Sequence, residues 1–310
     1  MPFNSFNSIA KLPKKRGGGP LWVAVGDSIG NTIATSTDRV TWTSRGISVI
    51  SNTAQGIKYT NGLWTAVGYS GGGGNTIATS PDGIVWTGRG SSAITAGGRA
   101  IAYGNNLWVA VGNGGNTIAT STDSISWTGR GASIITADAR AIAYGNNLWV
   151  AVGLGGNTIA TSTDGISWTG RGTSIFSSGG YAVSYGNNLW VAGGQGTNTI
   201  ATSTDGINWT GLGASIINSI VNSVAYGNNL WVAVGNGGYT IATSTNGFSW
   251  AGINSSTING TGRCVVYENN LWVVVGDGTT NTIATSINGS TWTGDGKPIF
   301  GSGFGIAYKP

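Results

Sequence analysis

Apolar and polar residues alternate along this chain in short segments, and one set of segments recurs from end to end. In one copy the segments RAIAYGN, LWVAVG, NTIATS and ISWTGR each have the character of a strand, at residues 99–105, 107–112, 116–121 and 125–130. They are rich in β-branched and aromatic residues, and Gly, Asn, Ser and Asp, which favour turns, separate them. The pattern therefore predicts four short strands in each copy.

Tryptophan marks the repeat. An LW pair occurs seven times, with gaps of 42, 44, 41, 41, 41 and 41 residues, and a second tryptophan ends each copy. Because every tryptophan of the chain belongs to one of these two sets, we expect a structural role for all of them. The sets are Trp22, Trp64, Trp108, Trp149, Trp190, Trp231 and Trp272, and Trp42, Trp86, Trp127, Trp168, Trp209, Trp250 and Trp292.

The second strand of the repeat indicates how the copies pack. In LWVAVG (107–112) both faces of the strand are apolar, so both must be covered. The preceding Asn105-Asn106 suits a two-residue type I′ hairpin, since Asn tolerates the positive φ that both positions need. Four-stranded units of about 40 residues that stack around an axis provide this cover. The sequence predicts an all-β fold, a seven-bladed β-propeller of four-stranded antiparallel blades.

The two ends of the repeat array predict how the ring closes. The first copy has the second, third and fourth strands but no first strand. The segment GFGIAYKP at residues 303–310 matches the missing strand, with Ile306 and Tyr308 standing where another copy has Ile101 and Tyr103. The C-terminal strand is therefore expected to complete the N-terminal blade and to remove an open sheet edge.

The composition agrees with an all-β fold and separates an N-terminal tail from the propeller. The 56 glycines and the charged content of 8% suit short strands joined by tight turns. No apolar run reaches the roughly 20 residues of a membrane-spanning helix, and no secretory signal is recognised. Residues 1–17, which include Lys14 and Arg16, are expected to form a flexible basic tail, and residues 18–310 the propeller. A cytoplasmic or virion-associated location is favoured.

The charge, the single cysteine and the absence of histidine exclude several kinds of partner and of catalytic site. The net charge of +5 comes from sparse residues with no dense Lys/Arg stripe, so nucleic acid is not favoured as a partner. Cys264 excludes an internal disulfide framework and is expected in the core, since sister copies have Ala or Ser there. The chain has no histidine, which excludes Ser–His and His–metal chemistry. No cofactor or metal is predicted.

The turn between the third and fourth strands carries a motif. It reads STDGISW at residues 162–168, and the other copies give STDRVTW, SPDGIVW, STDSISW, STDGINW, STNGFSW and SINGSTW. This resembles the Asp-box, or BNR, repeat of sialidases and sortilin-type receptors, although it is one residue shorter between Asp and Trp. The resemblance implies a structural turn whose side-chain oxygen accepts backbone N–H groups, at Asp38, Asp82, Asp123, Asp164, Asp205, Asn246 and Asn288.

A ligand site is expected on the upper face, where the loops differ between copies. At the start of the first strand, beside the channel, the copies place Gln55, Arg99, Arg140, Tyr181, Asn222, Arg263 and Phe304. The three arginines resemble the carboxylate-binding arginine triad of sialidases, and the guanidinium fork suits a carboxylate. The alternative is that these side chains line the channel and bond to neighbouring loops or water.

A second basic feature lies on the fourth strand, three residues after the second tryptophan. Four consecutive copies have arginine there: Arg45, Arg89, Arg130 and Arg171. Because this strand is outermost, the arginines are expected to form a basic arc on the rim. The arc either protects exposed sheet edges or docks an anionic partner.

Acidic residues do not suggest an active site. A glycosidase needs a close carboxylate pair, but Glu268 is expected on the lower face. In the upper loops that join the fourth strand of one copy to the first strand of the next, Asp138 is the single acid before the last copy. In the last copy Asp295 lies near the outer start of this loop. The sequence therefore predicts a protein that is not an enzyme.

The function favoured by the sequence is a non-catalytic binding or structural module that uses the upper loops or the outer rim. It would be a rigid scaffold for a protein partner or a surface assembly such as a virion. A glycan-binding lectin is the alternative, and a sialidase-like hydrolase is the third reading. A lectin would need repeated exposed pockets that combine aromatic and polar side chains. The sequence does not indicate the oligomeric state.

Overall fold

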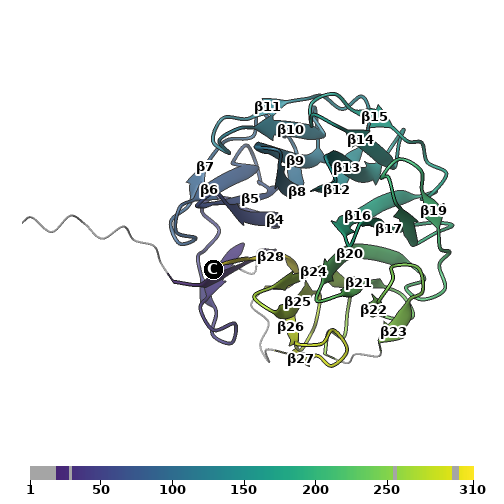
Figure 1. The fold of residues 1–310 in the computed structure, drawn as a ribbon. Coiled ribbons are helices and arrows are strands. Elements are labelled where there is room, and N and C mark those ends of the chain that lie inside the picture. The colour runs from purple at the N-terminus through teal and green to yellow at the C-terminus, as the bar shows by residue number, and fades with distance from the viewer. Residues whose placement is uncertain (1–18, 28–29, 254–256, 295–299) are drawn as a thin grey trace, which may run out of the picture.

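The structure is a computed structural model that describes residues 19–27, 30–253, 257–294 and 300–310. All its regular elements are β-strands, and they form a β-propeller, as the sequence predicted (Figure 1). The described residues include no helix with the length and apolar character needed to cross a membrane. The basic tail expected over residues 1–17 lies outside the described residues, as does Asp295.

Four antiparallel strands form each blade, and we number the blades 1 to 7 from the one that contains Trp22. The innermost strands, around the centre of the ring in Figure 1, are β28 (Gly303–Lys309), β4 (Thr53–Thr60), β8 (Gly97–Gly104), β12 (Asp138–Gly145), β16 (Gly179–Gly186), β20 (Ile220–Gly227) and β24 (Gly262–Glu268). The second strands are β1 (Leu21–Gly26), β5 (Leu63–Tyr69), β9 (Leu107–Asn113), β13 (Leu148–Leu154), β17 (Leu189–Gln195), β21 (Leu230–Asn236) and β25 (Leu271–Gly276).

The outer half of each blade is shorter. The third strands are β2 (Ile33–Ser36), β6 (Ile77–Ser80), β10 (Ile118–Ser121), β14 (Ile159–Ser162), β18 (Ile200–Ser203), β22 (Ile241–Ser244) and β26 (Ile283–Ser286). The outermost strands, on the rim, are β3 (Thr43–Ser44), β7 (Thr87–Gly88), β11 (Thr128–Gly129), β15 (Thr169–Gly170), β19 (Thr210–Gly211), β23 (Ala251–Ile253) and β27 (Thr293–Gly294).

The outermost strands are shorter than the sequence suggested, and the turn before them explains why. Residues 125–130 were predicted to be a strand, but only Thr128–Gly129 pairs regularly with β10. The backbone N–H groups of Ile125 and Ser126 donate to Asp123 Oδ1 at 2.8 Å each. These donors are therefore taken by the turn and are not available to the ladder.

The ring closes through the last strand of the chain, as predicted. Strand β28 pairs antiparallel with β1, so that Tyr308 faces Trp22 and Ile306 faces Ala24. The rings of Trp22 and Tyr308 lie 4.7 Å apart. Ile306 is buried in a cluster with Val273 of β25, in blade 7. One strand therefore completes blade 1 and also packs against blade 7.

Packing between blades accounts for the apolar second strands. The tryptophans of these strands are at most 2% exposed, and each packs at a tilt against a tyrosine of the innermost strand of its own blade, with ring centroids 4.7 to 5.2 Å apart. Each core cluster combines residues of two neighbouring blades; one brings Val109 and Val111 of blade 3 against Trp149 and Ala151 of blade 4. The hairpin turn before β9 has the predicted left-handed pair, with φ of 47° at Asn105 and 56° at Asn106.

Candidate functional site

The side chains at the channel mouth owe their direction to a β-bulge in every blade. In β8 the pairing with β9 shifts between Gly98 and Ala100, which leaves Arg99 unpaired. The same shift occurs in the other innermost strands, and the residue left out is in each case the one that the sequence analysis named: Gln55, Arg140, Tyr181, Asn222, Arg263 and Phe304. A bulge residue has no ladder partner and can turn its side chain away from the sheet.

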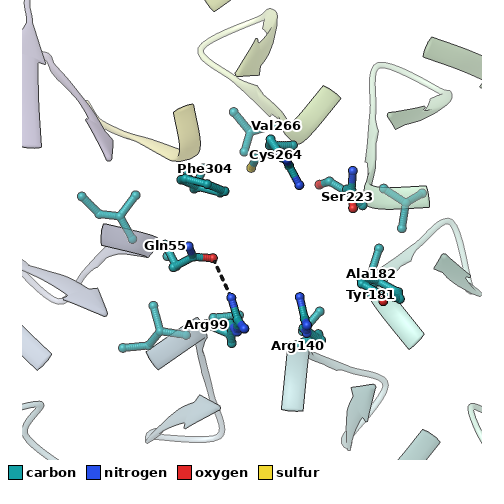
Figure 2. Close-up of a pocket in the computed structure, with 18 of the residues that line it drawn as sticks. Gln55, Arg99, Arg140, Tyr181, Ala182, Ser223, Cys264, Val266 and Phe304 are labelled. Carbon is teal, nitrogen blue, oxygen red and sulfur yellow. Dashed lines mark hydrogen bonds between the residues drawn. The ribbon is translucent and has the colours of Figure 1, made fainter. Parts of the chain in front are cut away.

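All seven bulge residues line one cavity on the propeller axis, with a volume of about 290 Å³. Figure 2 shows Arg99, Arg140, Tyr181 and Phe304 arranged around this opening. The lining of the cavity also includes small side chains such as Ala100 and several aliphatic ones. The candidate residues therefore lie together at the channel mouth, as the sequence suggested. Their role in binding stays a prediction.

Two of the arginines share one carboxylate, which the sequence analysis did not anticipate. Arg99 donates to Asp138 through Nε, at 3.1 Å, and through Nη2, at 2.8 Å. Arg140 Nε lies 2.7 Å from Asp138 Oδ2 in an ion pair, but its N–H makes no hydrogen bond. The side chain of Asp138 is 11% exposed. The protein's own carboxylate thus occupies the space between the two arginines.

The third arginine has a separate carboxylate. Arg263 donates from Nε and Nη2 to Asp277, at 3.0 and 2.6 Å. Its guanidinium also lies over the Phe304 ring, 5.5 Å from the centroid. Arg263 comes from blade 7, whereas Arg99 and Arg140 come from blades 3 and 4. The three arginines therefore form two separate ionic groups and not one triad.

Aromatic rings hold the guanidinium groups in place. Arg99 lies over Tyr69 at 4.7 Å and Arg140 over Tyr181 at 5.0 Å, each measured to the ring centroid. Burial raises the pKa of Tyr69, with the charge of Arg99 opposing that rise. A cation against an aromatic face is favourable and fixes the direction of the fork. Asp138, Asp277 and Tyr69 complete the site and were not among the predicted residues.

Polar contacts tie the other bulge residues to neighbouring strands. Gln55 Oε1 accepts a hydrogen bond from Arg99 Nη1 at 3.4 Å. The Tyr181 hydroxyl donates to Gln195 Oε1 at 3.3 Å, and Asn222 Nδ2 donates to the carbonyl oxygen of Gly262 at 3.0 Å. The contacts of Gln55 and Asn222 cross blade boundaries, and that of Tyr181 lies within blade 5.

Cys264 and Glu268 both lie on β24. Cys264 was expected in the core; it packs against the blade 7 and blade 1 cluster but also lines the axial cavity. Burial raises the pKa of its thiol to about 11, so the thiol is neutral at physiological pH. Glu268 ends the strand, away from Arg263, and burial raises its pKa while Lys58 opposes the rise.

The rim arginines lie beside the outermost strands, in the predicted arc. Each donates from Nε to a threonine hydroxyl of the third strand at 2.8 to 2.9 Å. The pairs are Arg45 with Thr35, Arg89 with Thr79, Arg130 with Thr120, and Arg171 with Thr161.

The seven turns before the outermost strands share one hydrogen-bond pattern. In blade 4, Asp164 Oδ1 accepts from the backbone N–H groups of Ile166 and Ser167 at 2.8 and 2.7 Å, and from the Ser162 hydroxyl. These donors lower the pKa of Asp164 from 3.8 to about 2. The equivalent oxygen of Asp38, Asp82, Asp123, Asp205, Asn246 and Asn288 accepts the same pair of backbone groups.

Known proteins resemble this chain in fold. A family model described as the DUF6242 beta propeller domain matches residues 122–255. Among solved structures, a streptogramin B lyase is 14% identical, with a TM-score of 0.67 over 77% of this chain and 81% of that one. YCF48 from Cyanidioschyzon merolae is 14% identical, with a TM-score of 0.54 over 78% and 84%.

A further structure, titled YCF48 bound to D1 peptide, is 17% identical, with a TM-score of 0.57 over 78% of this chain and 81% of that one. Among curated proteins, none matches the chain significantly. Identities this low show a shared architecture and do not transfer a ligand or an activity. The family model and the solved structures together identify the chain as a β-propeller.

Proposed function

We propose that the protein is a non-catalytic binding module whose axial cavity accepts a carboxylate of a protein partner. The observation that carries this proposal is the set of seven bulges, which aim seven side chains at one cavity (Figure 2). The surrounding strands repeat almost unchanged, whereas the bulge residues include Gln, Arg, Tyr, Asn and Phe. Different side chains on a repeated scaffold are expected where a specific ligand binds.

The charge balance at the mouth favours an anionic group. Asp138 carries one negative charge and faces two arginines, while Asp277 balances Arg263. The mouth therefore keeps one net positive charge. No described residue accepts a hydrogen bond from Nη1 or Nη2 of Arg140, whose side chain is 28% exposed. These two donors match the geometry of a carboxylate.

The size of the cavity favours part of a larger ligand. Its volume of about 290 Å³ is at the lower limit for sites that enclose a whole small molecule, roughly 300–1,000 Å³. A single acidic side chain or a peptide C-terminus fits such a space, while the rest of the partner would lie across the upper loops. The peptide complex of the YCF48 propeller offers a parallel for a protein ligand.

The lining does not favour catalysis. Among the described residues no carboxylate lines the cavity, and the thiol of Cys264 is neutral. Asp138 and Asp277 are engaged with arginines, so a pair of free carboxylates, as a glycosidase requires, is not formed by them. We therefore favour binding over the sialidase-like alternative.

In this proposal the seven turns have a structural role and are related to the Asp-box repeat. The support is local: one side-chain oxygen accepts two backbone N–H groups, and in blade 4 Trp168 Nε1 donates to the Gly165 carbonyl oxygen at 3.1 Å. Asn246 makes the same contacts as the aspartates, so the turn needs an acceptor and not a charge.

The test is a selection of short random peptides with free C-termini on the wild-type protein, followed by affinity measurements on Arg140→Met. Enriched peptides should carry an acidic side chain or depend on the free C-terminus. Arg140→Met should weaken their binding by about 10-fold or more, as for loss of a charge-assisted hydrogen bond. The fold should persist, because Asp138 keeps its hydrogen bonds to Arg99.

Arg171→Met is the matched control, since it removes the same charge from the rim. It should leave peptide affinity unchanged. Peptides that bind wild-type protein and Arg140→Met equally, or a selection that enriches none, would contradict the proposal.

A further inference from the structure

The rim carries a hollow between neighbouring blades, which we call a rim notch. Between blades 1 and 2 it has a volume of about 240 Å³. Blade 1 contributes Arg45 and Ser48 beside the apolar Val49, and blade 2 contributes Ile84 and Trp86. The notch thus combines a guanidinium, a hydroxyl, an aliphatic side chain and an indole ring.

The same notch recurs at other blade boundaries. Between blades 3 and 4 a hollow of about 120 Å³ is lined by Arg130, Ser133, Ile166 and Trp168. Between blades 5 and 6 a hollow of about 110 Å³ has Leu212 in place of the arginine. The boundaries 2/3 and 4/5 carry the same residue types at the equivalent positions: Arg89, Ser92, Ile125 and Trp127, and Arg171, Ser174, Ile207 and Trp209.

Arg45, Arg89, Arg130 and Arg171, at the four boundaries from blades 1 and 2 to blades 4 and 5, are held by hydrogen bonds but have no carboxylate in an ion pair among the described residues. Their Nε atoms donate to threonine hydroxyls, which directs the guanidinium along the blade surface. The ion pairs of the described residues involve Asp138 and Asp277, so none includes a rim arginine. Each of these arginines therefore keeps its charge for an external anion.

The apolar wall of the notch is exposed and fixed. Ile84 and Ile166 are 46% and 45% exposed, at the position that follows the turn corner. The indole N–H of Trp86 donates to the Gly83 carbonyl oxygen at 3.0 Å, which pins the ring. An apolar wall beside a charged group suits a ligand that has a ring face and an anionic substituent.

The turns that contribute the isoleucines also carry aspartates, and these aspartates do not line the arginine notches. Asp82 and Asp164 are absent from the walls of the two arginine notches. Their Oδ1 atoms accept backbone N–H groups of the turn. Within each of these notches the arginine is the charged group.

From these features we infer that the rim binds an anionic polysaccharide, a chain of pyranose rings that bear carboxylate groups. Two arginine notches, with the same residue types at the two boundaries that alternate with them, match a ligand that itself repeats, and a peptide of varied sequence does not. Each ring would pack on the isoleucine and the indole, with its carboxylate against the arginine. Several weak contacts in series give a high overall affinity, because each later contact is intramolecular.

The experiment measures binding of polygalacturonate to the full chain by calorimetry, with neutral dextran and dextran sulfate for comparison. One variant carries Arg45→Met, Arg89→Met, Arg130→Met and Arg171→Met. A second carries Ile84→Ser, Ile125→Ser, Ile166→Ser and Ile207→Ser, a change for which blade 7 gives a precedent, since Ser290 occupies this position. We expect the arginine variant to lose about 100-fold in affinity and the isoleucine variant about 10-fold.

Arg39→Met, a charge removal on the turn of blade 1, should bind as wild type. Equal affinity of the isoleucine variant and wild-type protein would overturn the proposal, since binding would then rest on charge alone. Tighter binding of polyglutamate than of polygalacturonate would also overturn it, in favour of an acidic peptide. The outcome is independent of the peptide selection, because that test depends on Arg140.

Discussion

At several blade boundaries a valine on the second strand of one blade faces a glycine on the innermost strand of the next. At one boundary the two residue types are exchanged. A Cβ built on Gly98, Gly180 or Gly262 would lie 2.6 to 2.7 Å from the Cβ of a valine in the preceding blade. Between blades 5 and 6 the glycine is instead Gly193, on the second strand, and the valine is Val221, on the innermost strand. We predict that Gly193→Val and Val221→Gly each destabilise the protein and that the two together restore it.

The magnitude follows from the contacts. A Cβ on Gly193 would lie 2.4 Å from Val221 Cγ1 and 2.9 Å from its Cβ, well inside the 3.5–4.0 Å of a favourable carbon contact. Overpacking of this kind costs about 2–3 kcal/mol. Val221 is fully buried, so its removal leaves a cavity and costs about 3 kcal/mol. The double variant recreates the arrangement of Val152 and Gly180, and we expect it to lose no more than about 1 kcal/mol.

Equilibrium unfolding in urea, followed by tryptophan fluorescence, measures the four free energies of the cycle. The coupling between the two substitutions should be favourable by at least about 3 kcal/mol. Equal m-values would show that the four proteins unfold over comparable surfaces. A double variant whose loss equals the sum of the two single losses would refute the reasoning.

Three further predictions concern closure, the turns and the mouth. Ile306→Ala should lower the unfolding free energy by about 3 kcal/mol, seen as a drop in Tm, and deletion of residues 303–310 should cause aggregation; a deletion that melts at the wild-type temperature would contradict closure. Asp164→Ala should cost about 1 kcal/mol at neutral pH; because the folded pKa is depressed to about 2, the charge-dependent part of this contribution is present above pH 4 and lost as the pH falls through 2, so the difference between the two proteins in urea titrations should narrow there. Asp138→Asn should cost about 2 kcal/mol by leaving Arg99 and Arg140 without a counter-charge, and an unchanged midpoint in urea would argue against a shared ion pair.

The repeat determined the architecture from sequence alone, because its signals are local. Four short strands, the paired asparagines of a tight hairpin and an apolar second strand are present in each copy. The closing strand could be assigned because residues 303–310 resemble a segment that the first copy lacks. The predicted fourth strand was too long, because the backbone N–H groups of its first residues bond to Asp123 Oδ1 and not to a neighbouring strand.

Part of the candidate site could also be found from the sequence, because its residues occupy one position of the repeat. Arg99, Arg140 and Arg263 stand out because sister copies have other residues at that position. Their chemistry depends on partners that no local pattern reveals. Asp138 lies 39 residues from Arg99 in the chain but 2.8 Å from it in space. Without that contact, the sequence left two readings of the arginines open: a site for a carboxylate, and a channel lining bonded to neighbouring loops or water.

Contacts between blades are decided only by the tertiary structure. The bulges turn seven side chains to the axis, the rim notches combine an outer strand with the turn of the next blade, and Val221 fills the space left by Gly193. A repeated sequence specifies each blade by short-range hydrogen bonding and alternation of apolar residues. The shape and charge between blades arise from residues about 40 positions apart in the chain, and these meet only when the ring has formed.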